Sequence, residues 1–231
     1  MTFPMSRMIQ PFAAGAALLA ALAGCGGGDT PKAADSSPPA APAAPLILVV
    51  GTSLTAGLGL DPSEAYPAVL QQKIDSAGLD YRVVNRGVSG ETSAGARQRV
   101  DWLMQQPVAV LILETGANDG LRGLDPDSLR VNIEAIVRRA RQQRPPPVIL
   151  LLGMEAPPNL GADYTGRFRA VYREAAADLG VPLVPFLLQG VGGIDSLNQA
   201  DGIHPTAAGQ RRVADLVWSA LRPLLRQAPR S

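Results

Sequence analysis

The sequence predicts an α/β fold, a three-layer α/β/α sandwich whose central sheet is parallel. Two observations carry this prediction. Short segments that are continuously apolar recur along the chain, and such runs are typical of strands buried on both faces. Segments with helical periodicity separate these runs, and alternation of strands with helices favours a parallel sheet. The 231 residues are enough for one domain with a sizeable core.

Five segments are predicted as strands. Residues 46–50 read Leu-Ile-Leu-Val-Val and stop at Gly51, and residues 108–114 give the strongest strand signal in the chain. The predicted strands are residues 46–50, 81–85, 108–114, 148–152 and 182–185.

Helices are predicted after each strand. Gly78 provides a stop for the first helix, and three prolines at residues 145–147 stop the third. In the third helix Leu129, Ile133 and Ile136 recur at helical spacing, so one face is expected to be buried. The predicted helices are residues 66–77, 94–104, 126–141, 164–179 and a last helix that begins near 206 and ends before Pro223.

The N-terminal region predicts export. Arg7 precedes an apolar stretch over residues 12–23 that is too short to span a bilayer comfortably, and small residues follow it, so residues 1–24 are predicted to be a signal peptide. The Leu-Ala-Gly-Cys run that ends at Cys25 resembles the bacterial lipobox, in which the cysteine becomes the lipidated first residue. An ordinary cleaved signal with an incidental cysteine is the alternative. Cys25 is the chain's single cysteine, which excludes an intramolecular disulfide.

The lipobox resemblance implies a protein anchored by lipid in the cell envelope, on the periplasmic side. Gly26 rather than aspartate after the cysteine favours the outer membrane. Residues 25–45 are rich in Gly, Pro and Ala and are predicted to be a tether. The folded domain is predicted over residues 46–226.

Composition excludes some classes of function. A net charge of +1 offers no basic surface for nucleic acid. Aromatic residues make up only 4% of the chain, which argues against base-stacking platforms and extended sugar-binding grooves.

Three loops that follow predicted strands could carry chemistry, because such loops meet at the carboxyl edge of a parallel sheet. Ser53 follows the first strand among glycines and could be a nucleophile, or it could bond to its own loop. Gly90 follows the second strand and would let a backbone N–H approach a ligand, although a simple turn capped by Ser93 is an alternative. Asn118 follows the third strand and could donate to an oxyanion, or could belong to an ordinary turn.

His204 is the only histidine of the chain and lies three residues after Asp201, just before the last predicted helix. In a turn of that length the carboxylate can reach one ring nitrogen while the other faces outward, which is how a general base is oriented in catalytic triads. A lone histidine is more often structural, and a metal site would need several further ligands.

Four blocks in this order resemble the SGNH hydrolases, also called GDSL esterases, and are most similar to their bacterial thioesterase, arylesterase and lysophospholipase branch. The resemblance extends over about residues 46–225 and implies a flavodoxin-like sheet of five parallel strands. The blocks are residues 51–57, 87–92, 116–123 and 201–205.

The resemblance implies a role for each candidate residue. Ser53 would be the nucleophile, His204 the general base and Asp201 the carboxylate that orients it. The N–H groups of Ser53 and Gly90 and the side chain of Asn118 would form the oxyanion hole. The implied reaction is hydrolysis of carboxylic esters or thioesters through an acyl-enzyme, with no metal and no organic cofactor.

Two positions depart from the family pattern. Thr52 stands where the family has aspartate, and a hydroxyl both donates and accepts hydrogen bonds whereas a carboxylate only accepts. The hydrogen bonds that support the nucleophile loop are therefore expected to be rearranged. Ala117 replaces the second glycine of a common Gly-Gly-Asn-Asp form, which is expected to alter the backbone slightly.

The substrate is less defined. Residues 155–164 resemble the mobile substrate loop of the same branch, so Met154, Pro157 and Leu160 are the predicted substrate-binding residues. With Leu187 and Leu188 they could form an apolar acyl groove, and packing in the core is an equally good interpretation.

The expected partners are a small ester or lipid substrate and the membrane, with the chain itself a monomer. Two alternatives stay open. An O-acetylesterase acting on cell-envelope glycans could use the same triad, although the few aromatic residues argue against it. A weakly catalytic lipoprotein that only binds a ligand is suggested by Thr52, whereas the intact set of other site residues argues against it.

Overall fold

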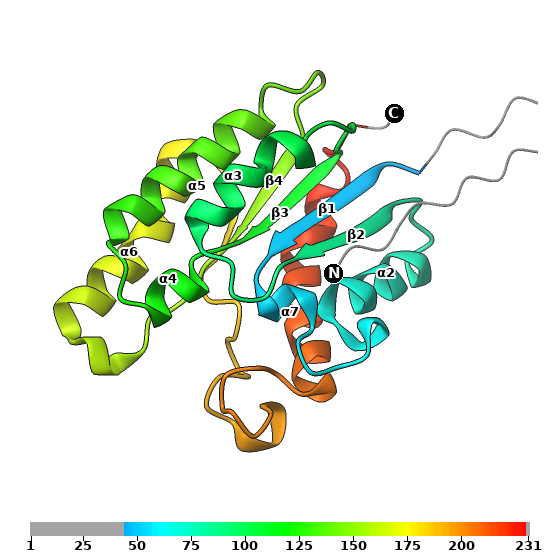
Figure 1. The fold of residues 1–231 in the computed structure, drawn as a ribbon. Coiled ribbons are helices and arrows are strands. Elements are labelled where there is room, and N and C mark those ends of the chain that lie inside the picture. Colours follow the sequence, from blue (N-terminus) through cyan, green and yellow to red (C-terminus); the bar gives the residue numbers. More distant parts are fainter. Residues whose placement is uncertain (1–43, 230–231) are drawn as a thin grey trace, which may run out of the picture. The chain divides into compact units, whose positions relative to one another are not determined.

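The computed structural model describes residues 44–229, and the predicted signal peptide, Cys25 and residues 26–43 of the predicted tether lie outside this range. Its five strands form one parallel sheet in the order β2-β1-β3-β4-β5 (Figure 1). This order is that of flavodoxin-like folds, and it confirms the predicted fold class. The strands are β1 (Leu46–Gly51), β2 (Arg82–Gly87), β3 (Val110–Glu114), β4 (Val148–Leu152) and β5 (Leu183–Val184).

Helices cover both faces of the sheet. Helices α3, α5 and α6 lie side by side on one face, and α2 and α7 pack together on the other (Figure 1). Among the helices within residues 44–229, none is both long and apolar enough to cross a membrane. The helices are α1 (Ser53–Ala56), α2 (Tyr66–Ser76), α3 (Ser93–Leu103), α4 (Ala117–Leu121), α5 (Pro126–Ala140), α6 (Ala162–Leu179) and α7 (Ala207–Leu224), with 3₁₀ turns at Pro62–Glu64, Pro158–Leu160 and Asp195–Leu197.

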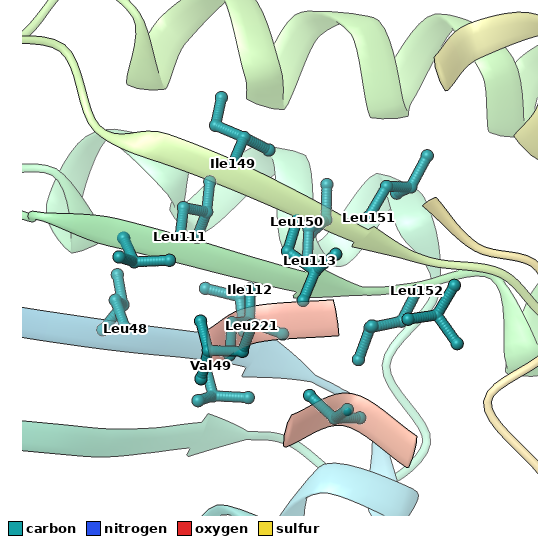
Figure 2. Close-up of a cluster of buried hydrophobic side chains, with 14 of the residues drawn as sticks. Leu48, Val49, Leu111, Ile112, Leu113, Ile149, Leu150, Leu151, Leu152 and Leu221 are labelled. Atoms are coloured by element: carbon teal, nitrogen blue, oxygen red, sulfur yellow. The ribbon is translucent and has the colours of Figure 1, made fainter. Parts of the chain in front are cut away.

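The core lies on both sides of the three inner strands. Every residue of β1 and β3 is buried, as the unbroken apolar runs predicted. Strand β2 lies at the edge of the sheet and is partly exposed, which explains its mixed composition. Figure 2 shows the branched side chains that pack between the sheet and its helices. Those labelled are Leu48, Val49, Leu111, Ile112, Leu113, Ile149, Leu150, Leu151, Leu152 and Leu221.

Two predicted helix ends are wrong in detail. The N-cap of α3 is Thr92, whose hydroxyl accepts from the N–H of Gly95, and Ser93 is instead a buried residue of the first turn. Helix α7 continues through Pro223 to Leu224. Proline removes only one backbone donor in this last turn, and burial of Leu224 against the core favours continuing the helix.

Two short helices, α1 and α4, occupy segments that the sequence suggested were loops. Helices of four or five residues are unstable by themselves. They form here because the chain leaves β1 and β3 at the carboxyl edge of the sheet and finds hydrogen-bond partners there. Both carry residues of the predicted site.

Candidate active site

Ser53 is the first residue of α1, directly beyond the end of β1. Thr52 is the N-cap of this turn, and its hydroxyl accepts from the N–H of Leu54. Gly57 closes the turn in the left-handed region at φ 76°, where a Cβ would lie 2.6 Å from the Cβ of Ala65. The turn thus leaves the side chain of Ser53 partly exposed at the carboxyl edge of the sheet.

Asp201 and His204 form a compact turn ahead of α7. One carboxylate oxygen of Asp201 accepts from the N–H groups of Ile203 and His204 at 2.9 and 3.0 Å. The other lies 2.6 Å from Nδ1 of His204. These bonds hold the pKa of Asp201 well below its usual range, chiefly through the His204 N–H and then through the imidazole. Asp201 is therefore a carboxylate at neutral pH.

The far side of the imidazole meets the serine. His204 Nε2 lies 2.9 Å from Oγ of Ser53. With Nδ1–H donated to Asp201, Nε2 carries the lone pair and can accept the proton of the serine hydroxyl. The side chain of His204 is 16% exposed, so the ring is held by its surroundings and still reaches the solvent-facing serine.

Side chains from the third block hold the loop that contains Gly90. The amide nitrogen of Asn118 donates to the carbonyl of Glu91 at 2.9 Å, and Arg122 donates to the carbonyl of Gly90 at 3.0 Å. Gly90 itself has a positive φ of 78°. Ser53 opens α1, so its N–H has no acceptor within the helix. The structure thus brings the loop of Gly90 to the side chain of Asn118.

A cavity of about 310 Å³ opens beside the serine. Met154 and Pro157, two of the three residues predicted to bind substrate, line it. Leu160 and Gly90 do not line it, and Leu187 is fully buried in the core. The other lining residues are Ser53, Leu54, Ala117, Asn118, Leu121, Glu155, Ala156, Phe186, Leu188, Gly192, Gly193, Gly202 and Ile203.

A second hollow, of about 460 Å³, is lined by residues such as Arg82, Pro107 and Arg144 and contains no predicted site residue. Within residues 44–229, no group of three or more His, Cys, Asp or Glu side chains could hold a metal ion.

Sequence reasoning missed two buried carboxylic acids near the site. Glu114 is fully buried and bonds to the loop of Ser53. Asp119 is also buried and accepts from the N–H and hydroxyl of Ser93 at 2.8 and 2.5 Å, which ties α4 to α3. A signal was present for Glu114, because an acidic residue at the end of an apolar strand is seldom buried without a role.

A family model for the GDSL-like lipase/acylhydrolase family matches residues 49–212. The chain belongs to this family. It is 46% identical over 184 residues to the esterase TesA of Pseudomonas aeruginosa, covering 79% of this chain and 90% of that protein. It is 36% identical over 187 residues to thioesterase 1/protease 1/lysophospholipase L1 of Escherichia coli K12, covering 80% of this chain and 87% of that protein.

A solved structure agrees with this assignment. The crystal structure of the psychrotrophic esterase EstA from Pseudoalteromonas, inhibited by monoethylphosphonate, superposes with a TM-score of 0.73 at 31% identity. The match covers 78% of this chain and 98% of EstA. This GDSL family member is therefore a carboxylic-ester hydrolase, as the sequence predicted.

Proposed function

We propose that the protein hydrolyses carboxylic esters or thioesters through an acyl-enzyme formed on Ser53, with His204 as general base and Asp201 as its orienting carboxylate. One observation carries the proposal. The serine hydroxyl, the imidazole and the carboxylate form a continuous chain of hydrogen-bonding atoms with separations of 2.9 and 2.6 Å. This is the relation between nucleophile, base and orienting acid that acyl transfer requires.

The reaction has two halves. Oγ of Ser53 attacks the acyl carbonyl carbon while Nε2 of His204 takes its proton, and the charge on the new oxyanion is met by the N–H groups of Ser53 and Gly90 and by the amide of Asn118. His204 then gives the proton to the departing alkoxide or thiolate. Water then attacks the acyl carbonyl carbon while Nε2 of His204 takes its proton, and His204 returns this proton to Oγ of Ser53 as the bond to the serine breaks and the carboxylic acid is released. Asp201 stays ionised throughout and stabilises the imidazolium.

The cavity favours an acyl chain as the group held beside the serine. Apolar side chains dominate its lining, with Leu54, Met154 and Phe186 among them. Leu121 and Ile203 also line it and are 47% and 43% exposed, so contact with a substrate chain would remove apolar surface from water. An aliphatic acyl group is the partner that such a lining stabilises.

The test is hydrolysis of nitrophenyl esters with acyl chains from two to sixteen carbons. Ser53→Ala is expected to abolish turnover, with a loss of about 10⁴-fold or more. Ser196→Ala, an exposed serine in a 3₁₀ turn, is the matched control and should keep full activity. Equal rates for the wild type and Ser53→Ala would contradict the assignment. Activity confined to acetyl esters would instead indicate an acetylesterase.

The chain-length profile also tests the cavity. Met154 lines it whereas Leu160 does not. Met154→Ala is therefore expected to raise KM for longer acyl chains, and Leu160→Ala should leave the profile unchanged. The opposite pattern would place the acyl chain along the 155–164 loop rather than in the cavity.

We also propose that Cys25 carries a lipid that anchors the protein to the periplasmic side of the cell envelope, at the outer membrane. The support is the Leu-Ala-Gly-Cys sequence that ends at Cys25 and the Gly26 that follows it. Cys25→Ser should move the protein from the membrane to the soluble fraction, and unchanged membrane association would refute the anchor. Light scattering of the domain over residues 46–226 tests the predicted monomer.

A further inference from the structure

Glu114 lies at the end of β3, is fully buried, and takes no part in the proposed reaction. Its carboxyl oxygens accept from the backbone N–H of Thr52 at 2.6 Å and from the hydroxyl of Thr52 at 2.9 and 3.0 Å. The hydroxyl of Thr55 donates to it at 3.0 Å. All the hydrogen bonds that the described residues give this side chain thus come from the turn that carries Ser53.

A carboxyl group in this environment is costly to bury. No ion pair within residues 44–229 involves Glu114. Burial raises its pKa, with Glu91 adding to the rise, and the bonds from Thr52 and Thr55 oppose it. A leucine would fill the end of a buried strand at far lower cost. The carboxyl group therefore has a task that an apolar side chain could not perform.

That task follows from the shortness of α1. Four residues cannot hold a helical turn by themselves, so side chains from other elements fix it. Gln210 donates to the carbonyl of Leu54 at 3.1 Å, and Asn85 donates to the carbonyl of Thr55 at 2.8 Å. These two bonds restrain the backbone at the end of the turn. Glu114 binds the backbone at its beginning through Thr52, next to Ser53, and also binds the side chain of Thr55.

Gly51 and Thr55 pack closely around the carboxyl group of Glu114. A Cβ at Gly51 would lie 2.6 Å from Oε2 of Glu114 and 2.0 Å from Oγ1 of Thr55, so glycine is needed there. Thr52 supplies a hydroxyl donor where the resembling family has aspartate. An aspartate carboxylate at this position could not donate to Glu114, whereas the threonine hydroxyl does. Threonine therefore completes the hydrogen bonding of Glu114.

We propose that Glu114 is a positioning residue for the nucleophile: through Thr52 and Thr55 its carboxyl group fixes the start of α1 so that Oγ of Ser53 stays within reach of Nε2 of His204. The inference rests on the proposed function of Ser53. It predicts a loss in kcat rather than in KM, because Glu114 does not line the cavity and acts on the nucleophile alone.

Three variants test the proposal on the nitrophenyl ester that the wild type hydrolyses best. Glu114→Gln keeps the size of the side chain and replaces one acceptor oxygen by an NH₂ donor. Thr52→Val removes the hydroxyl that donates to Glu114, and Thr52→Ser retains it. A shift of the nucleophile by about 1 Å can lower turnover about 100-fold. We expect kcat to fall about 10- to 100-fold in Glu114→Gln and Thr52→Val, with KM within about twofold, and Thr52→Ser to recover most of kcat.

A matched control separates positioning from stability. Tyr81→Phe removes a buried hydroxyl that donates to the carbonyl of Leu225 at 2.7 Å. Tyr81 directly precedes β2, so it lies at the amino ends of the strands, whereas the Ser53 turn follows the carboxyl end of β1. Tyr81→Phe should lower the melting temperature about as much as Thr52→Val and leave kcat unchanged. The rate at which a nitrophenyl phosphonate labels Ser53 should fall with kcat in the Glu114 and Thr52 variants and stay normal in Tyr81→Phe.

The outcomes distinguish the positioning role of Glu114 from the proposed role of Ser53 as nucleophile. Retained hydrolysis by Ser53→Ala would overturn the proposed function. An inactive Ser53→Ala beside wild-type kcat and labelling in Thr52→Val would overturn the role of Glu114 alone, as would a loss carried by KM. If Glu114→Gln does not fold, Thr55→Val decides the question, because it removes a hydroxyl that donates to Glu114 and leaves the Thr52 cap of α1 intact.

Discussion

His204 and Ser53 are 151 positions apart in the chain, yet Nε2 of the histidine lies 2.9 Å from Oγ of the serine. The serine follows the first strand and the histidine precedes the last helix. The parallel sheet brings them together because both lie at its carboxyl edge. The whole proposed chemistry depends on this one contact.

Because His204 is the only histidine, its modification is an unusually clean test. Diethyl pyrocarbonate should modify one histidine per chain and abolish hydrolysis, and a phosphonate adduct on Ser53 should protect the ring. His204→Ala is expected to lower kcat about 10⁴-fold. Full activity after stoichiometric modification would show that another group is the base.

Asp201→Asn should be nearly as damaging although it preserves shape. The asparagine oxygen can still accept the N–H groups of Ile203 and His204, so the turn survives. The NH₂ group of the asparagine would face Nδ1 of His204 and donate to it, which favours the tautomer that carries its proton on Nε2. A protonated Nε2 cannot accept the proton of the serine hydroxyl. We expect kcat to fall about 10⁴-fold. Asp195→Asn, an exposed aspartate of the same segment, is the control. A loss below tenfold would leave Asp201 without its proposed role.

The low pKa of Asp201 also predicts how stability depends on pH. A carboxyl whose pKa is lower in the folded than in the unfolded protein stabilises the fold above its unfolded value, about 3.9, and this contribution is lost as the pH falls below it. The stability difference between wild type and Asp201→Asn should therefore shrink as the pH falls below about 4. Urea unfolding of both proteins from pH 2 to pH 5 measures it, and a difference that stays constant over this range would contradict the prediction.

Asn118→Ala tests the oxyanion hole. It removes the proposed side-chain donor and the bond to the carbonyl of Glu91. The expected loss is about 10²- to 10³-fold in kcat with little change in KM, because the donor serves the transition state more than the bound ester. Asn159→Ala, an exposed asparagine of the 155–164 loop, should behave as wild type. A loss that falls mainly on KM would indicate a role in ground-state binding.

The sequence predicted the sheet well and its short helices poorly, and both outcomes have a physical cause. Strands buried on both faces must be apolar throughout, so β1, β3 and β4 are visible as local runs. A helix of four or five residues has no local signature, because distant side chains stabilise it. Strand β5 is shorter than the predicted 182–185, because only Leu183 and Val184 pair with β4.

Within the site, the loops could be predicted and their supports could not. Ser53, Gly90 and Asn118 each follow a predicted strand, and strand ends of a parallel sheet meet. Glu114 bonds to a residue 62 positions away, and no local pattern encodes that contact. Leu160 fits an apolar loop in sequence, yet the 3₁₀ turn Pro158–Leu160 places it outside the cavity lining.

Gly116→Ala should destabilise the fold through a position that touches no substrate. Gly116 adopts φ 98°, and a Cβ there would lie 2.3 Å from the hydroxyl of Tyr172, which donates to the carbonyl of Thr115. Backbone strain of a non-glycine residue at such a positive φ costs about 1–3 kcal/mol before the clash is counted, so we expect a loss of at least about 2 kcal/mol in the free energy of unfolding.

Gly166→Ala is the matched control, because Gly166 lies inside α6 with nothing within 4 Å of an added Cβ. Alanine there should stabilise the protein by up to about 1 kcal/mol. Urea unfolding of both variants gives the comparison, and equal stabilities would show that the backbone at Gly116 tolerates a side chain.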